Sequence, residues 1–108
     1  MCGICGFFSP EPIDPSVIRK MNDQIIHRGP DDDGFYQHES VTLAARRLSI
    51  IDLNTGHQPL GSASGDNWIA YNGEVYNFPE LRTELEERGI PFRTKTDTEV
   101  IVNLYENL

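Results

Sequence analysis

Apolar and polar positions follow two different periods along the chain, and each period predicts a kind of element. The apolar run Gly3–Phe8 is short, carries two aromatic residues and stops at Ser9-Pro10, which predicts a buried strand. Asp14 is a favoured helix N-cap followed by proline, and apolar residues then recur at helical spacing. We therefore predict a helix that begins after Asp14 and ends near His27, before Arg28-Gly29-Pro30.

The middle of the chain predicts a hairpin and a further strand. Phe35–His38 and Val41–Ile51 have the composition of strands, and the short gap at Glu39-Ser40 predicts that they pair. The Gly- and Ser-rich stretch Thr55–Asp66 predicts a loop, and Trp68–Asn72 predicts the strand that follows it.

Two more helices are predicted toward the end of the chain. Asn77 and Pro79 open the first, which closes at Gly89, and a strand is expected at about Ile90–Arg93. Thr96-Asp97-Thr98-Glu99 has the form of a capping box and begins the second helix. The apolar residues of this helix fall on one predicted face and are Val100, Ile101, Leu104, Tyr105 and Leu108.

Strands joined by hairpin-length gaps, followed by helices, predict an α+β layered domain with mostly antiparallel pairing. At 108 residues the chain is one domain at most. The last helix still runs at Leu108, and the predicted strands have no complete set of partners. We therefore expect the chain to be the first part of a longer domain.

The charge balance argues against two classes of partner. The chain has 17 acidic and nine basic residues and a net charge of −8, which is unsuited to binding nucleic acid or an anionic membrane. Apolar runs stay well below the ~18 residues of a spanning helix. No basic region precedes the N-terminal apolar stretch, as it would in a secretory signal. A cytoplasmic protein without structural disulfides is the expectation.

Cys2 and Cys5 have the C-x-x-C spacing of a thiol redox pair or of half a zinc site. A redox pair usually lies at a helix N-terminus, whereas this segment predicts a strand, in which the two thiols point to opposite faces. A zinc site needs further ligands, and His27, His38 and His57 show no metal-ligand spacing, so no metal site is predicted. Cys5 is then a small buried apolar residue, the usual role of a free cysteine.

Cys2 has a second interpretation, because removal of Met1 would leave it as the N-terminal residue. Its small side chain favours that removal. The free α-amine, whose ordinary pKa is ~7.7–8, then lies on the same residue as the thiol and can act as its general base. From these residues alone, a nucleophile and an ordinary N-terminal cysteine both stay open.

Six short motifs are distributed along nearly the whole chain and are specific when taken together in their order. They are MCGICGFF at the N-terminus, HRGPDDDG at His27–Gly34, RRLSIIDL at Arg46–Leu53, GHQPL at Gly56–Leu60, YNGEVYNF at Tyr71–Phe78 and KTDTEVI at Lys95–Ile101. With these motifs the chain resembles the glutaminase domain of class II glutamine amidotransferases, which are of the N-terminal nucleophile (Ntn) type. The RLSIIDL, HQPL and NGEVYN forms are most similar to those of glutamine-hydrolysing asparagine synthetases.

The resemblance implies a catalytic set for hydrolysis of the glutamine side-chain amide through a thioester. Cys2 matches the family nucleophile. Asn72 and Gly73 match the oxyanion hole, the first through its side-chain amide and the second through its backbone N–H. Asn72-Gly73 is also a favoured type I′ hairpin turn, although the residues after it do not alternate as a return strand would.

The same resemblance implies a glutamine-binding set. Arg47 matches the anchor of the α-carboxylate, and it ends the apolar face of its predicted strand whereas Arg46 lies on the other face. The further positions that match glutamine-binding residues are Leu48, Ser49, Ile50, Ile51, Asn72, Gly73, Glu74 and Asp97. Asp97 matches the partner of the α-ammonium, and as a carboxylate in the first turn it also suits the helix dipole. The acidic segment His27–Gly34 does not have the spacing of a calcium loop, and we interpret it as a structural turn.

The resemblance further implies an Ntn-hydrolase-like four-layer αββα sandwich of mostly antiparallel sheets, with residues 1–108 as its N-terminal part. The rest of that domain and an ATP-dependent synthetase domain, which makes asparagine from aspartate, are expected outside this sequence. ATP and Mg²⁺ are therefore expected there, and no cofactor in this segment. The expected partners are glutamine and the synthetase domain of the same chain, and a homodimer stays open.

Three alternatives accompany this hypothesis. One is a class II amidotransferase with a different ammonia acceptor, and another is a zinc or redox module built on Cys2 and Cys5. The third is a non-catalytic regulatory or interaction domain. The intact set that speaks against the third consists of Cys2, Arg47, Asn72, Gly73, Glu74 and Asp97.

Overall fold

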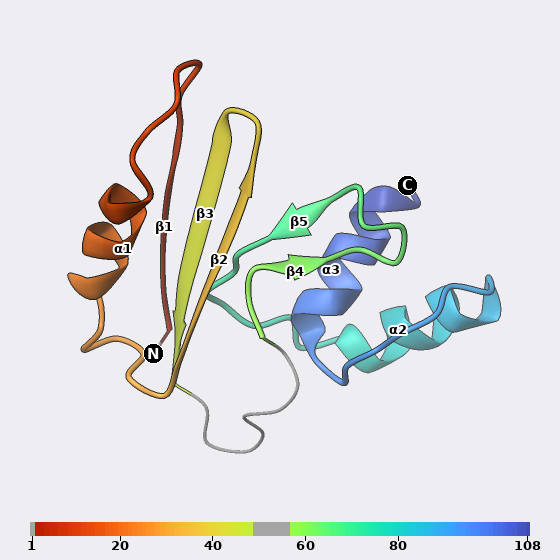
Figure 1. The fold of residues 1–108 in the computed structure, drawn as a ribbon. Coiled ribbons are helices and arrows are strands. Elements are labelled where there is room, and N and C mark those ends of the chain that lie inside the picture. Colours follow the sequence, from red (N-terminus) through yellow and green to blue (C-terminus); the bar gives the residue numbers. More distant parts are fainter. Residues whose placement is uncertain (1, 49–56) are drawn as a thin grey trace.

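The computed structural model describes residues 2–48 and 57–108, which form an α+β structure with two antiparallel sheets. The elements are β1 (Gly3–Phe8), α1 (Pro15–Asp23), β2 (Asp32–His38), β3 (Val41–Arg47), β4 (Leu60–Gly61), β5 (Trp68–Ile69), α2 (Phe78–Glu87) and α3 (Asp97–Glu106). Figure 1 shows α1, the sheet of β1 to β3, the pair β4–β5, and then α3 with α2 following one another across the molecule. The predicted α+β class and the antiparallel pairing are confirmed.

The larger sheet has the strand order β1-β3-β2. β1 has the predicted bounds, and β2 and β3 form the predicted hairpin, with Glu39 in the left-handed region (φ 52°) in its turn. β2 begins at Asp32 rather than at Phe35. β3 ends at Arg47, and the last residues of the strand predicted to reach Ile51 lie outside the described residues.

One face of this sheet is covered by α1. The helix begins as predicted, because the Asp14 carboxylate accepts a hydrogen bond from the Ser16 N–H at 2.8 Å, and this bond lowers the pKa of Asp14. It ends at Asp23, and residues 24–28 continue as turns instead of as helix to His27. Ile18 is buried against β1 and β3, which gives this face its apolar contact.

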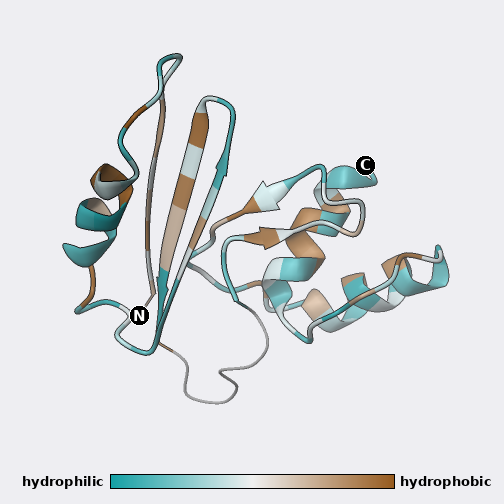
Figure 2. Ribbon diagram, viewed as in Figure 1, coloured by the Kyte–Doolittle hydropathy of each residue, from teal (hydrophilic) through white to brown (hydrophobic). Residues whose placement is uncertain are grey.

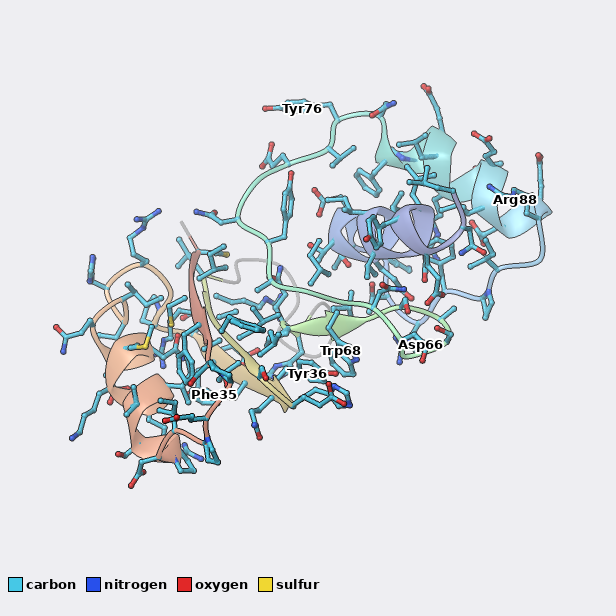
Figure 3. The ribbon with its side chains drawn as sticks, turned by 90° about the horizontal axis from the view of Figure 1, so that it is seen from above. Phe35, Tyr36, Asp66, Trp68, Tyr76 and Arg88 are labelled. Atoms are coloured by element: carbon cyan, nitrogen blue, oxygen red, sulfur yellow. The ribbon has the colours of Figure 1, made fainter. Side chains whose placement is uncertain are left out.

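The opposite face of the sheet meets β4–β5. The rings of Tyr36 in β2 and Trp68 in β5 stack with their centroids 4.1 Å apart and an angle of 13° between their planes. Figure 3 shows this pair between the part that contains α1 and the part that contains α3. The stack therefore joins the two sheets at one point along β2.

The second half of the described chain packs around α3. Leu85 of α2 and Val100 of α3 are fully buried where the two helices meet. α2 begins after Asn77 and ends before Gly89 (φ 84°) as predicted, and the Ile90 N–H closes it by donating to the Leu85 carbonyl. Among the described residues, no helix is long and apolar enough to cross a membrane.

Two predictions for the region around β4 and β5 were partly wrong. Gly61 lies in a strand instead of in a loop, because it has no side chain and lets the ring of Trp68, its register partner, lie across it. A Cβ at this glycine would lie 3.0 Å from that ring. The strand predicted over Trp68–Asn72 stops at Ile69, and the Tyr71 N–H donates to a side chain, that of Gln58, at 2.7 Å.

The strand predicted at Ile90–Arg93 was wrong. The backbone N–H groups of Arg93 and Thr94 donate to the carboxylate of Glu99 at 2.9 and 2.6 Å, so they are not available to a sheet. The capping box is half formed: the Thr96 side chain accepts from the Glu99 N–H at 3.4 Å, while the Glu99 carboxylate is used by Arg93 and Thr94. Glu99 is fully buried, and these bonds replace its hydration.

The predicted apolar face of α3 is only partly the buried one. Val100 is fully buried, but Tyr105 is 67% exposed and Leu108 is 94% exposed. The helix instead buries Thr98, Glu99, Val100, Val102 and Asn103. Two polar members of this set have partners 40 positions away in the sequence: Thr98 Oγ1 accepts from Gln58 Nε2 at 3.3 Å, and Asn103 Oδ1 accepts from the Ala63 N–H at 2.8 Å. Hydrophobicity alone did not predict this face.

Apolar side chains remain exposed on the larger sheet. Phe8 is 74% exposed, and Ile4 and Val41 on the same face are also exposed. Figure 2 shows hydrophobic residues along β3, in β4 and in the middle of α3, and mostly hydrophilic ones along β2. Trp68 of β5 lies against Tyr36 on this face, and Phe8, Ile4 and Val41 stay exposed.

Candidate functional site

Cys2 and Arg47 lie at the same end of neighbouring strands. Gly3, the first residue of β1, is opposite Arg46 of β3 in the antiparallel pair. When this register is continued by one residue, Cys2 lies beside Arg47. Strand alternation places both side chains on the face of the sheet on which Tyr36 stacks against Trp68 of β5. Cys2 is a free, half-buried thiol. The structure thus brings together the predicted nucleophile and the predicted carboxylate anchor.

The mostly buried side chain of Arg47 is paired with Asp32. Arg47 Nη1 lies 3.6 Å from Asp32 Oδ2, and the two residues are register partners on β3 and β2. The same oxygen lies 2.8 Å from Nδ1 of His57. Asp32 therefore stands between a guanidinium and an imidazole, and its carboxylate orients both. Sequence reasoning did not predict that these three residues meet, and the only signal was that each of them lies in one of the motifs.

A second group of predicted residues surrounds the N-terminus of α3. Gly73, Glu74 and Asp97 line one pocket of about 480 Å³. Asp97 Oδ2 accepts a hydrogen bond from the Val75 N–H at 3.0 Å, which attaches the segment after Asn72 to the first turn of the helix. Asn72 is exposed at the edge of this segment. A backbone donor and two carboxylates thus border one cavity.

The structure decides one alternative for Asn72-Gly73. No strand lies among residues 70–77, so these two residues are not the turn of a hairpin. Gly73 lies close to the Tyr71 side chain, since a Cβ at Gly73 would lie 2.6 Å from the hydroxyl of Tyr71. A larger residue at this position would push the tyrosine ring aside, so glycine allows the close approach.

The predicted residues form two groups, which do not share this pocket. Cys2 and Arg47 are not among the residues that line it. Leu48 follows β3 and is exposed. Ser49, Ile50 and Ile51 lie outside the described residues.

Cys5 has a different environment from Cys2. Its thiol lies 3.8 Å from Oδ1 of the fully buried Asn22 of α1, and burial raises the pKa of this thiol. A raised pKa disfavours the thiolate, the reactive form. Within residues 2–48 and 57–108, no three His, Cys, Asp or Glu side chains are arranged to hold a metal ion. The surroundings of Cys5 are those of a structural cysteine.

Comparison with known protein families identifies the class to which this fold and site belong. A family described as "Glutamine amidotransferase domain" matches residues 1–108, which is the whole chain. The chain therefore belongs to the glutamine amidotransferase domain family.

Several relatives of the chain are named glutamine-hydrolysing asparagine synthetases. The chain is 46% identical to "Asparagine synthetase [glutamine-hydrolyzing] 1" of Bacillus subtilis, in an alignment that covers 99% of the chain and 18% of that protein. It is 41% identical to "Asparagine synthetase B [glutamine-hydrolyzing]" of Escherichia coli, over 98% of the chain and 20% of the relative. A root asparagine synthetase of Pisum sativum is 37% identical, over 98% and 18%. The chain is homologous to a part of these proteins, about a fifth of their length.

Proposed function

We propose that this chain is the N-terminal part of a glutaminase domain in which Cys2 attacks the side-chain amide of glutamine. The observation that carries the proposal is the placement of Cys2 and Arg47 on one face, at the same end of neighbouring strands. A nucleophile beside a carboxylate anchor suits a substrate with an amide at one end and an α-carboxylate at the other. Membership of the glutamine amidotransferase domain family supports this substrate.

The chemistry needs Cys2 to be the N-terminal residue. Its neutral α-amine takes the thiol proton as the sulfur attacks the amide carbon, and a tetrahedral intermediate forms. The Asn72 side-chain amide and the Gly73 N–H stabilise the oxyanion. The protonated α-amine of Cys2 then returns the proton to the leaving nitrogen. The C–N bond breaks, ammonia is released and a thioester of Cys2 remains. Water, activated by the same amine, hydrolyses the thioester to glutamate and restores the thiol.

The binding roles follow from the charges of the side chains. Arg47 pairs with the α-carboxylate in a bidentate manner, and Asp97 pairs with the α-ammonium. Glu74 contributes a second acceptor at this polar end, beside Asp97 in the same pocket. Leu48, Ser49, Ile50 and Ile51 contact glutamine, largely through backbone groups.

In the full-length protein, we propose that the ammonia is used for ATP-dependent synthesis of asparagine from aspartate. The names of the relatives support this acceptor, and their greater length supports a synthetase part with ATP and Mg²⁺ outside these 108 residues. We also propose that the α and β elements found here are the N-terminal portion of a four-layer αββα sandwich. A different ammonia acceptor is the alternative within the family.

The decisive experiment compares the two cysteines in the full-length protein. We expect intact-mass analysis to show that Met1 is removed, and a glutamine-like electrophile to label Cys2. Cys2→Ser should lower ammonia release from glutamine by at least ~10³-fold, because the nucleophile is lost. Cys5→Ala is the matched control and should keep activity within about threefold, because this thiol only packs against α1. An active enzyme that retains Met1, or equal losses in both variants, would refute the proposal.

A further inference from the structure

Gln58 connects segments that carry the proposed site. Gln58 is buried, with only 8% of its surface exposed to solvent. Its side chain accepts a hydrogen bond from the Tyr71 N–H at 2.7 Å and donates one from Nε2 to Thr98 Oγ1 at 3.3 Å. Tyr71 directly precedes Asn72-Gly73, and Thr98 directly follows Asp97. One buried side chain is therefore bonded to the neighbours of both the oxyanion segment and the ammonium partner.

The orientation of the Gln58 amide is determined by its partners. A backbone N–H can only donate, so the atom that faces Tyr71 must be the amide oxygen. The amide nitrogen then faces Thr98, whose hydroxyl oxygen accepts from it. Both ends of the amide are used, and the side chain has one orientation that satisfies them.

The backbone of the same residue lies against the larger sheet. A Cβ on Gly34 of β2 would lie 1.8 Å from the carbonyl oxygen of Gln58, so only a glycine permits this approach. The preceding residue, His57, is 2.8 Å from Asp32, which pairs with Arg47. Residues 57 and 58 are thus attached to the sheet that carries Arg47 and, through β1, Cys2.

On the basis of the proposed function, we propose that Gln58 is a positioning residue for the oxyanion hole. Its backbone lies against the sheet that carries the nucleophile, and its side chain holds Tyr71, so it sets how far Asn72 and Gly73 stand from Cys2. Figure 3 shows that the chain runs on from Trp68 to Tyr76 between the sheet and the helices, which is the segment this bond holds. A misplacement of about 1 Å in such a site costs on the order of 10²-fold in rate.

Three variants of the full-length protein test this proposal. Gln58→Met keeps the length of the side chain and removes both hydrogen bonds. Gln58→Glu keeps an acceptor for the Tyr71 N–H, and the Thr98 hydroxyl can donate to its second oxygen. Gln37→Met is the matched control, because Gln37 is an exposed glutamine on β2 whose side chain donates a hydrogen bond to the Glu39 carbonyl of its own turn.

The measurement is steady-state ammonia release, divided by the amount of Cys2 that a glutamine-like electrophile labels. Dividing by the labelled amount corrects the measured rate for any loss of folded protein. Gln58→Met should lower kcat by about 10- to 100-fold with KM changed less than about threefold, because the oxyanion hole acts in the transition state. Gln58→Glu should recover at least a third of the wild-type kcat, and Gln37→Met should match the wild type. Hydrogen exchange of the Tyr71 amide should be faster only in Gln58→Met.

Three results would overturn the inference: an unchanged kcat per labelled site in Gln58→Met, an equal loss in Gln37→Met, or a Tyr71 amide whose exchange does not respond. An inactive wild type would instead refute the proposed glutaminase function. Failure of the inference and failure of the function are therefore distinguishable.

Discussion

Two adjacent arginines at the end of β3 have different surroundings. Arg46 is buried toward α1, where its Nε donates to the Gly29 carbonyl at 2.9 Å and its Nη1 lies 3.4 Å from Asp33. Arg47, on the opposite face, pairs with Asp32 at 3.6 Å. Because strand residues alternate, neighbours in sequence serve different parts of the molecule. The first holds the turn before β2, and the second is the one on the face of Cys2.

Loss of Arg47 and loss of Asn72 should affect different kinetic constants. Arg47→Ala removes the proposed carboxylate anchor and should raise KM for glutamine by about 10-fold or more, because a charged hydrogen bond is worth ~1.5–3 kcal/mol. Asn72→Ala removes an oxyanion donor and should lower kcat by ~10²–10³-fold. Steady-state kinetics of ammonia release in the full-length protein measure both. The assigned roles would be contradicted if both variants changed KM and kcat in the same proportion.

The end of α3 is attached to the loop between β4 and β5 by one carboxylate. Glu106 accepts hydrogen bonds from Ser62 Oγ at 2.6 Å and from Asn67 Nδ2 at 3.0 Å, and it is also bonded by Ser64. These bonds lower the pKa of Glu106 from 4.5 to about 2, and the hydrogen bond from Ser62 has the largest effect. The loop is therefore held by an ionised side chain.

This attachment predicts an acid-sensitive contribution to stability. The folded-state pKa is below the unfolded one, so the contribution is complete above about pH 4.5 and is lost as the pH falls toward about 2. In Glu106→Gln, the part of the pH dependence of the urea midpoint that lies in this window should disappear. Asp66→Asn in the same loop is the control and should keep it. A midpoint profile unchanged by Glu106→Gln would exclude the attachment.

Local rules were followed by some elements and overridden in others. The cap at Asp14 and the stop at Gly89 formed as predicted, because each depends on residues only a few positions apart. The predicted strand at Ile90–Arg93 did not form, because the Ile90 N–H donates to the Leu85 carbonyl and the Arg93 N–H donates to the buried carboxylate of Glu99. Its strand-like composition did not reveal that competitor.

The described chain as a whole leaves apolar surface uncovered. Phe8 and Val41 are exposed on the larger sheet, and Tyr105 and Leu108 at the end of α3. The relatives are about five times longer than the chain, since it spans 18–20% of their length. Further chain is therefore proposed to cover this surface in the full-length protein.

For this reason, the isolated 108-residue chain should differ from the full-length protein. We expect the isolated chain to associate at micromolar concentration and to release ammonia at less than about one hundredth of the full-length rate, because its site residues are not held within ~0.5 Å. Light scattering and glutaminase assays on the two proteins provide the comparison. A monomeric isolated chain that unfolds cooperatively and has full activity would disprove this prediction, while leaving the glutaminase proposal intact.

Short-range patterns in the sequence were enough to predict β1, the β2–β3 hairpin and the starts of the helices. Strand alternation and helix caps depend on a few neighbouring residues, so the sequence shows them directly. The motifs likewise indicated the family. The tertiary structure alone decided the short strand β4, the early end of β5, the polar buried face of α3 and the hydrogen-bond partners of Gln58 and Glu106. Gln58 joins residues 13 and 40 positions away, and Glu106 reaches 44 positions back to Ser62. Such partners are chosen by how elements pack, and no local period encodes them.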